Sequence, residues 1–207
     1  MENFKDRIKI APKDKYKVDN KPIKAFPYYK MYDENGNFVG QINPEKEKMQ
    51  HKWLRGVTCF LVNKKAEVLM ERRTSKGITP GKIDLVSGHC NEEEESSKTM
   101  QRELSEEIGI SVENDRIKHL GRLPLVFGGK RKFFIDFFFC QYNGEKLNVD
   151  PNEVESVSWV PIEQVLEMIE NCQTKFPSGN MYKQIFENLK NEMQKQNERS
   201  NGEEKWS

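Results

Sequence analysis

Three glutamates are spaced so that they could bind one metal ion together. Glu103, Glu106 and Glu107 stand at positions i, i+3 and i+4, which on a helix places their carboxylates on one face within reach of one another. Each like-charged neighbour would cost the helix about 0.2–0.5 kcal/mol, whereas a divalent cation with oxygen ligands would turn this repulsion into attraction. The alternative is a solvated acidic face, because glutamate is a good helix former and charge runs are common on exposed helices.

The residues around these glutamates form a familiar pattern. Gly88, Glu94 and Arg102 precede or adjoin them at fixed distances, and Gly109 follows. The segment GHCNEEEESSKTMQRELSEEIGI, residues 88–110, resembles the Nudix box, G-x5-E-x7-R-E-U-x-E-E-x-G-U with U aliphatic, and matches it at every specified position. Seven fixed residues of types used at roughly 5–10% each would match at a given start about once in 10⁷ or more rarely. The resemblance therefore favours metal binding over a solvated face.

This resemblance implies a fold and a set of catalytic residues. The fold is the Nudix α/β/α sandwich with a mixed β-sheet, in which the box forms a loop, a helix and a second loop. By position in the box, the residues at the metal would be Glu103, Glu106, Glu107 and, through its backbone, Gly88. Glu94 and Arg102 would act mainly as a structural pair that orients the helix and its loops.

The implied reaction is hydrolysis of a diphosphate, X–P–O–P–Y, by attack of water on phosphorus. A polyanionic substrate needs Mg²⁺ or Mn²⁺ to approach an acidic helix, and such an ion also polarises phosphorus and lowers the pKa of the attacking water. The general base is either a box glutamate or an acid from a loop outside the box, for which Glu153 and Glu155 are candidates.

Other residues are candidates for contact with the substrate. They are Arg55, Arg73, His89, Asp136 and Glu153. The two arginines could bind phosphate through charge-assisted hydrogen bonds, with solvated surface as the alternative. His89 would lie at the mouth of the site, as a contact or as a bystander. Asp136 stands in a phenylalanine-rich strand, where a carboxylate must be partnered, bound to a metal or protonated.

The box must be carried on a helix. We predict this helix over Glu92–Ile108, because the segment lacks Pro and Gly and carries an apolar stripe at four-residue spacing. The stripe consists of Met100, Leu104 and Ile108. Asn91 and Glu94 resemble a capping box at the start of the helix, and Gly109 would end it.

Strands are predicted both before and after this helix in the sequence. The predicted strands lie at Tyr28–Tyr32, Phe38–Ile42, Leu54–Val62, Val68–Arg72 and Ile83–Ser87, within residues 116–127 and 132–142, and directly before Pro161. Asn35-Gly36 is a hairpin signal, Pro161 opens a second helix, and a last helix covers Met181–Met193. The mixture predicts one α/β Nudix domain (27–195) with an N-terminal β-hairpin extension, after an extended lead-in (1–26) and before a flexible tail (196–207).

The flanking segments favour one branch of the family and raise a rival activity. YYKMYDENGNFVGQI, FFIDFFFC and KFPSGNMYKQI resemble Nudix hydrolases related to isopentenyl diphosphate isomerase. The isomerase has a catalytic Cys where this chain has Ser87, and a metal-ligand His where it has Leu54. Without its acid–base Cys an isomerase should be nearly inactive, which favours hydrolysis. A Nudix module that binds a ligand without turnover is the other alternative, and the intact box argues against it.

Composition limits the partners and the compartment. Lys and Arg number 34 against 33 Asp and Glu, a net charge of +1, which gives no bulk reason to expect binding to a nucleic acid polymer or a membrane surface. No apolar run approaches the roughly 18 residues needed to cross a bilayer, and the first residues lack the apolar core of a signal peptide. We therefore expect a cytoplasmic protein whose partner is a small diphosphate, and the family resemblance allows a homodimer.

The remaining cysteines and histidines are expected to have no chemical role. The cysteines form no C-x-x-C pair, which predicts reduced and mostly buried thiols at Cys59, Cys90, Cys140 and Cys172. His51 and His119 are expected on the polar surface.

Overall fold

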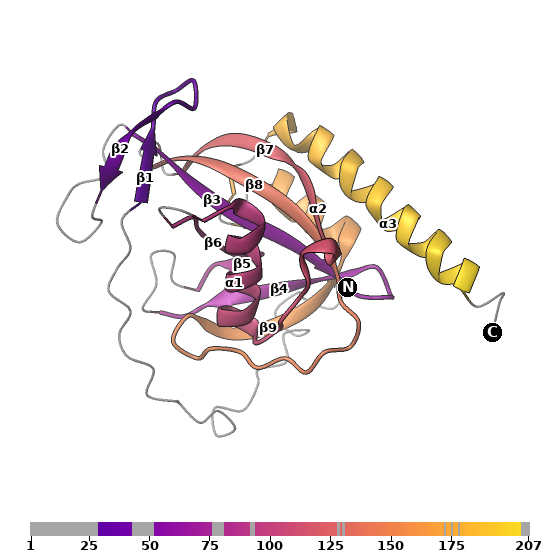
Figure 1. Ribbon diagram of the computed structural model, residues 1–207. Helices are drawn as coiled ribbons and strands as arrows, with labels where there is room; N and C mark the ends of the chain where they lie inside the picture. Colours follow the sequence, from indigo (N-terminus) through magenta and orange to yellow (C-terminus); the bar gives the residue numbers. More distant parts are fainter. Residues whose placement is uncertain are drawn as a thin grey trace.

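The computed structural model describes residues 29–42, 52–75, 81–91, 94–127, 129, 131–171, 173–174, 176–177 and 179–203. These residues form a nine-stranded, mostly antiparallel sheet with three α-helices (Figure 1). The strands are β1 (Tyr29–Tyr32), β2 (Phe38–Ile42), β3 (Trp53–Val62), β4 (Glu67–Arg73), β5 (Ile83–Asp84), β6 (Val86–His89), β7 (Ile117–Phe127), β8 (Arg131–Gln141) and β9 (Val154–Pro161). The helices are α1 (Ser96–Ile108), α2 (Ile162–Glu170) and α3 (Lys183–Glu203), with short 3₁₀ turns at Asn114–Arg116 and Asn180–Tyr182.

Strand β3 is the centre of the sheet. It pairs antiparallel with β1, β4 and β6 and parallel with β8, which confirms the predicted mixed sheet. The parallel ladder runs from Trp53 opposite Lys132 to Val62 opposite Gln141. Strands β7 and β9 extend the sheet from β8 and β4. The predicted hairpin extension is formed by β1 and β2, whose connection has Gly36 at a φ of 82°, a left-handed conformation that favours glycine.

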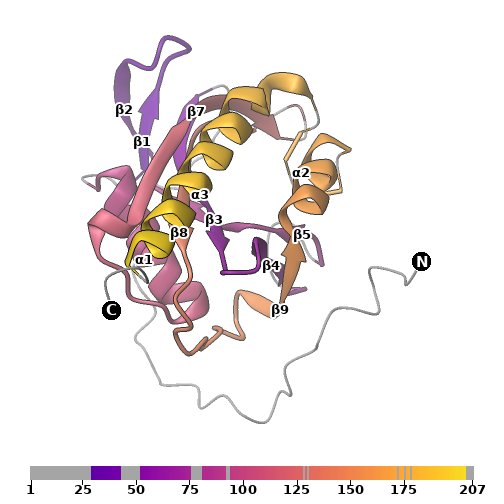
Figure 2. The same cartoon turned by 90° about the vertical axis from the view of Figure 1, so that its right-hand side faces the viewer.

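The sheet separates two apolar cores, because alternate residues of a strand face opposite sides. In β3, Leu61 packs on the side of α1, whereas Phe60 packs on the side of α2 and α3. In β8, Phe138 lies on the α1 side, and Phe137 and Phe139 lie on the other. The phenylalanine-rich strand is therefore buried on both faces, and the layers are helix, sheet and helices. Helix α3, yellow in Figures 1 and 2, runs along β7.

Helix α1 begins later than predicted. It covers Ser96–Ile108, and its N-cap residue is Glu95, which makes no side-chain capping hydrogen bond. The predicted capping box of Asn91 and Glu94 is wrong, because the Glu94 carboxylate accepts hydrogen bonds from Arg102 instead. The Glu94 carboxylate also accepts a hydrogen bond from the Thr99 hydroxyl, so its contacts are with side chains of α1.

The interior and end of α1 are as predicted. The side chains of Met100, Leu104 and Ile108 are completely buried against the sheet. Gly109 ends the helix with a φ of 73°, and its backbone N–H bonds to the Leu104 carbonyl. This apolar stripe fixes the rotation of the helix, and with it the direction of the glutamates.

Two other elements differ from their predicted bounds. The strand predicted over Ile83–Ser87 is divided into β5, which pairs with β4, and β6, which pairs with β3. The last helix continues to Glu203 instead of ending at Met193, so residues 196–203 of the predicted flexible tail are helical. The segment is polar but rich in helix formers, and side-chain pairs such as Gln194–Glu198 support it.

Some predictions fall outside the described residues, namely those for the lead-in 1–26, His51 and Cys172. The other cysteines, Cys59, Cys90 and Cys140, are buried and not in disulfides. Within the described part of the chain, no helix has both the length and the apolar character to cross a membrane.

Candidate active site

The buried stripe of α1 gives its three glutamates different surroundings. The side chains of Glu103 and Glu107 are 10% and 1% exposed, and that of Glu106 is 29% exposed. The Glu103 carboxylate lies against the backbone of Gly88 in β6, because a β-carbon on residue 88 would be only 1.9 Å from Glu103 Oε1. Only glycine at residue 88 leaves room for this carboxylate.

Arg102 joins the loop before α1 to the carboxylates on the helix. Its Nε and Nη2 donate to Glu94 at 3.1–3.2 Å, and Nη2 also donates to the His89 carbonyl at 3.0 Å. Its Nη1 donates to Glu103 Oε1 at 2.7 Å and to Glu106 Oε2 at 3.0 Å. The pair of Glu94 and Arg102 expected from the box is thus present, and it holds both the loop and the helix.

Glu107 belongs to a second, deeper network. Its Oε2 accepts a hydrogen bond from the Ser87 backbone N–H at 3.2 Å, and its Oε1 lies 3.4 Å from Arg73 Nη1. The same Arg73 nitrogen lies 3.2 Å from Glu71 Oε1, on a β4 side chain with no exposed surface. Arg73, a candidate phosphate ligand in the sequence, is therefore engaged here as the counterion of two buried carboxylates.

The electrostatics of this region favour additional positive charge. Burial raises the pKa of Glu103 to about 7 against the lowering effect of Arg102, and the charge of Glu153 raises it further. Burial also raises the pKa of Glu107 well above its ordinary value, and the charges of Glu71 and Glu103 add to this. The arginines present do not compensate all the carboxylates, so a bound cation would favour the ionised forms.

The residues fit a divalent cation by their chemistry. Among the described residues no three acidic, His or Cys side chains are gathered as an ion site, since the Arg102 guanidinium lies between Glu103 and Glu106. The available donors are nevertheless carboxylate oxygens, the ligands that Mg²⁺ and Mn²⁺ prefer. They are partly buried and short of positive charge, and the Glu103 carboxylate packs into the space that a side chain on residue 88 would fill.

Asp136 is partnered rather than protonated. The Asp136 side chain is 1% exposed and accepts hydrogen bonds from Arg55 at 3.1 Å and Ser96 at 2.6 Å. Arg122 donates to both of its oxygens at 2.9 Å, and His119 Nε2 lies 2.8 Å from Oδ1. Although burial opposes it, these hydrogen bonds hold the pKa of Asp136 well below its usual value. His119 is half exposed, as expected of a surface residue, but its ring contacts this buried carboxylate.

The remaining candidates lie around α1. His89 stacks on Tyr29, with ring centroids 5.1 Å apart and planes 19° from parallel, and also contacts Phe133. Glu153 is exposed, and its charge raises the pKa of both Glu103 and Glu107, so it lies within electrostatic range of them. Glu155 is exposed on β9.

Two parts of the site were not predicted from the sequence. Glu71 shares the Arg73 guanidinium with Glu107. The strand pattern could have revealed Glu71, because it follows Leu69 by two residues and so shares its α1-facing side. Tyr29, Lys30 and Tyr32 of the hairpin also adjoin the box, and nothing in the local sequence indicates this long-range contact.

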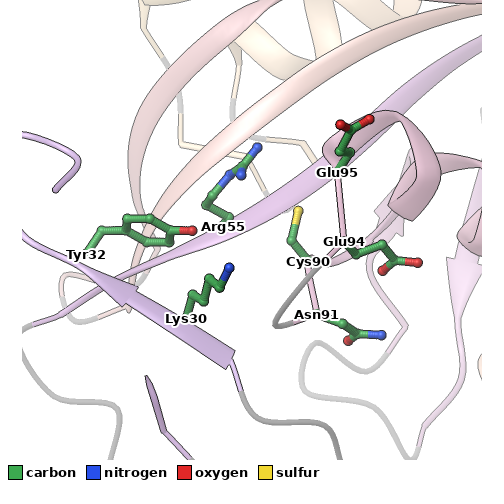
Figure 3. Close-up of a pocket in the computed structure, with 7 residues that line it drawn as sticks. All are labelled: Lys30, Tyr32, Arg55, Cys90, Asn91, Glu94 and Glu95. Atoms are coloured by element: carbon green, nitrogen blue, oxygen red, sulfur yellow. The ribbon is translucent and has the colours of Figure 1, made fainter. Parts of the chain in front are cut away.

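A cavity of about 220 Å³ opens beside the box (Figure 3). Its lining comes from β1, from β3 and from the loop before α1, and consists of Lys30, Tyr32, Arg55, Cys90, Asn91, Glu94 and Glu95. We call it the Arg55 pocket. Of the predicted substrate contacts, it includes Arg55 but not Arg73, His89, Asp136 or Glu153.

Fold and site together define a three-layer α/β/α protein with an acidic helix packed against a glycine at a strand end. A family model described as the NUDIX domain matches residues 52–183. The chain therefore belongs to the Nudix family. Family membership supports pyrophosphohydrolase activity as the general class.

Solved structures show the same fold. The Deinococcus radiodurans protein DR0079 has a TM-score of 0.59 at 19% identity, covering 77% of this chain and 98% of that one. The MutT protein of Methanosarcina mazei Go1 has a TM-score of 0.53 at 25% identity, covering 68% and 94%. The Nudix domain of Shewanella oneidensis NrtR, solved in complex with ADP-ribose, has a TM-score of 0.51 at 19% identity, covering 73% and 94%.

A comparison with curated proteins gave no match. Neither the family model nor these structures distinguishes the isopentenyl diphosphate isomerase-related branch from the rest of the family. That finer resemblance stays a prediction.

Proposed function

We propose that this protein is a divalent-metal-dependent Nudix hydrolase that cuts a phosphoanhydride bond in a nucleoside diphosphate-linked or similar diphosphate substrate. The observation that carries the proposal is the burial of Glu103 and Glu107, with Glu106 beside them, against the side-chain-free backbone of Gly88. The carboxylates outnumber the positive charges beside them. This excess of negative charge is expected of a site that binds divalent cations and, through these cations, a polyanionic substrate.

The three box glutamates would hold Mg²⁺ or Mn²⁺, with the Gly88 backbone beside them. When bound, the ion supplies positive charge that polarises phosphorus and lowers the pKa of water. Arg102 keeps Glu103 and Glu106 on the side of α1 that faces the loop, and Arg73 and the Ser87 N–H hold Glu107 in place. These contacts preorganise the carboxylates before any substrate arrives.

The base that takes the proton of the attacking water is either a box glutamate or Glu153. Of the two acids outside the box, Glu153 is favoured over Glu155, because its charge acts on Glu103 and Glu107. If Glu153 is the base, a Glu153→Gln variant should lose activity by about 100-fold or more, because glutamine cannot accept the proton of the attacking water. An unchanged rate would leave the base among the box glutamates.

The function is tested by a panel of diphosphates with Mg²⁺ or Mn²⁺, with products identified by ³¹P NMR. The panel includes a nucleoside triphosphate, a nucleotide sugar, a dinucleotide, isopentenyl diphosphate and ADP-ribose, the last because a Nudix domain of this fold was solved with it. We expect metal-dependent cleavage of at least one compound, and a loss of about 100-fold or more in Glu106→Gln. The matched control is Glu187→Gln on the exposed side of α3.

Three results would contradict the proposal. Tight binding of a panel compound without turnover would indicate a ligand-sensing module. Conversion of isopentenyl to dimethylallyl diphosphate would indicate an isomerase. Equal loss of activity in Glu106→Gln and Glu187→Gln would show that α1 does not carry the reaction.

A further inference from the structure

The residues around Asp136 carry more positive than negative charge. Two arginines, Arg55 and Arg122, share the one Asp136 carboxylate. The Arg122 side chain is 46% exposed, so water can offset its charge. The Arg55 side chain is 24% exposed, and its Nε is buried without a hydrogen-bond partner among the described residues. Arg55 therefore keeps positive charge that the described protein groups do not fully balance.

Arg55 presents this charge to the Arg55 pocket. Lys30 supplies a second cation, and Figure 3 shows the Tyr32 hydroxyl pointing towards Arg55. Two carboxylates also line the pocket, but Glu94 is held by Arg102, and Glu95 is exposed. In Figure 3 both point away from Lys30. A cavity of about 220 Å³ with two cations suits a compact anion such as a phosphate group.

The pocket is connected to the acidic helix by one side chain. Glu94 lines the pocket and accepts hydrogen bonds from Arg102, and the same guanidinium donates to Glu103 and Glu106. A substrate whose diphosphate lies at α1 could therefore place a further anionic group in the pocket.

Asp136 determines where Arg55 points. Arg55 Nη2 donates to Asp136 Oδ2 at 3.1 Å and to the Ser96 hydroxyl, and Ser96 in turn donates to the same Asp136 oxygen. Arg122 and His119 fix the carboxylate from the opposite side. These groups come from β3, β7, β8 and the first turn of α1, so the direction of Arg55 is set by four elements at once.

We propose that the Arg55 pocket receives an anionic group of the substrate, with a phosphate as the best match, and that Asp136 is the positioning residue that directs Arg55 towards it. This rests on the proposed function, because it assigns a second anionic group to the same diphosphate substrate. Arg55 and Lys30 would make the contact, and Asp136 would act only through Arg55.

The pocket is tested by titrating the full chain with inorganic phosphate in EDTA, following binding by calorimetry and by two-dimensional ¹H–¹⁵N NMR. Without metal and without turnover, this measurement does not depend on the hydrolysis assay. We expect saturable binding that perturbs the resonances of β1 and residues 89–91, and affinity about tenfold lower in Arg55→Met. The control is Lys190→Gln, an exposed cation on α3, with unchanged affinity. Absence of saturable binding, or a phosphate affinity in Arg55→Met equal to that of the wild type, would contradict the proposal that the Arg55 pocket binds an anion.

The positioning role is tested by Asp136→Asn. A pure charge effect and a positioning effect predict opposite changes in phosphate affinity for this variant. Removing a negative charge near Arg55 would by itself strengthen phosphate binding, whereas misdirecting Arg55 weakens it. We expect affinity several-fold lower, and equal or higher affinity would overturn the role. If Asp136→Asn does not fold, Ser96→Ala provides the test, because it removes a contact to both Arg55 and Asp136 without changing charge. A drop in affinity supports the role, and unchanged affinity refutes it.

Discussion

Gly88 is the residue whose type the site constrains most directly. Its missing side chain is the space into which the Glu103 carboxylate packs. In Gly88→Ala the new methyl group would displace that carboxylate, so we expect activity to fall roughly 10–100-fold and stability to fall by about 1–3 kcal/mol. Rates and urea denaturation measure the two effects. Ser105→Ala, on the exposed side of α1, is the control, and a Gly88→Ala enzyme as active as this control would contradict the packing described.

The raised pKa of Glu103 makes the metal-free protein sensitive to pH. Its folded-state pKa of about 7 lies above the ordinary value of 4.5, so the folded protein binds the proton more tightly than the unfolded chain does. The contribution of this group to stability is therefore full below pH 4.5 and is lost as pH rises towards 7, by roughly 3 kcal/mol.

We accordingly expect the Tm in EDTA to fall between pH 5 and pH 8, and Mg²⁺ to raise the Tm most at the upper end. Scanning fluorimetry across this range measures both trends. Glu103→Gln should flatten the profile in EDTA, since it removes the titrating group. A wild-type profile that rises with pH in EDTA would contradict the burial of Glu103.

At this residue scale, the sequence placed the box glutamates on one helix because their spacing matches the helical repeat. It could not indicate that Arg102 would lie between Glu103 and Glu106, since side-chain geometry at a crowded site depends on all neighbours together. The contact of Asp136 with Arg55 also joins residues 81 positions apart. Burial of Asp136 implied a partner but not which one.

At the scale of elements, α1 is held by hydrogen bonds from one arginine as well as by its apolar stripe. Arg102→Lys keeps the charge, but a lysine cannot bond Glu94, Glu103 and Glu106 in the same fixed geometry. We expect a loss of about 1–3 kcal/mol in the free energy of unfolding, measured in urea, and a lower rate with metal. Arg131→Lys, at an exposed position in β8, should change neither quantity. Equal stability of the two variants would show that the network is dispensable.

The elements themselves were largely predictable because strand and helix periodicities differ. The stripe in α1 and the phenylalanine-rich β8 were recognised in this way, and both are buried as expected. The predicted start of α1 was too early because the Glu94 carboxylate accepts hydrogen bonds from Arg102. This contact forms only when the loop before α1 folds back onto the helix. The end of α3 was misplaced because a polar segment can stay helical without burying a face.

At the scale of the whole molecule, the predicted domain end at residue 195 can be tested by truncation. Among the α3 side chains that the structure describes, up to residue 198, those of Ile185, Phe186 and Leu189 are buried, and none of residues 194–198 is. Deleting residues 196–207 should therefore change stability by less than about 1 kcal/mol and leave activity intact, as measured by urea denaturation and turnover. Deletion after Glu187 removes Leu189 and should cost about 2–5 kcal/mol. If the variant that lacks residues 196–207 is unfolded, the domain must end further along the chain than residue 195.

The three layers were predictable from alternating strands and amphipathic helices, whereas the Arg55 pocket was not. The pocket exists because β1 of the hairpin lies beside β3 and the loop before α1. The hairpin and the loop before α1 are almost sixty residues apart in the sequence. No local pattern predicts their contact, because it depends on the order of strands in the folded sheet.

The metal site on α1 is tested most directly by the binding of Mn²⁺ to the metal-free protein, measured by electron paramagnetic resonance of the free ion. If the carboxylates of α1 hold the ion, the wild type binds Mn²⁺, and Glu103→Gln combined with Glu106→Gln lowers the affinity at least about tenfold. Glu187→Gln should bind as the wild type does. Equal Mn²⁺ affinity in the wild type and the double variant, or no binding at all, would contradict the claim that this helix is the metal site.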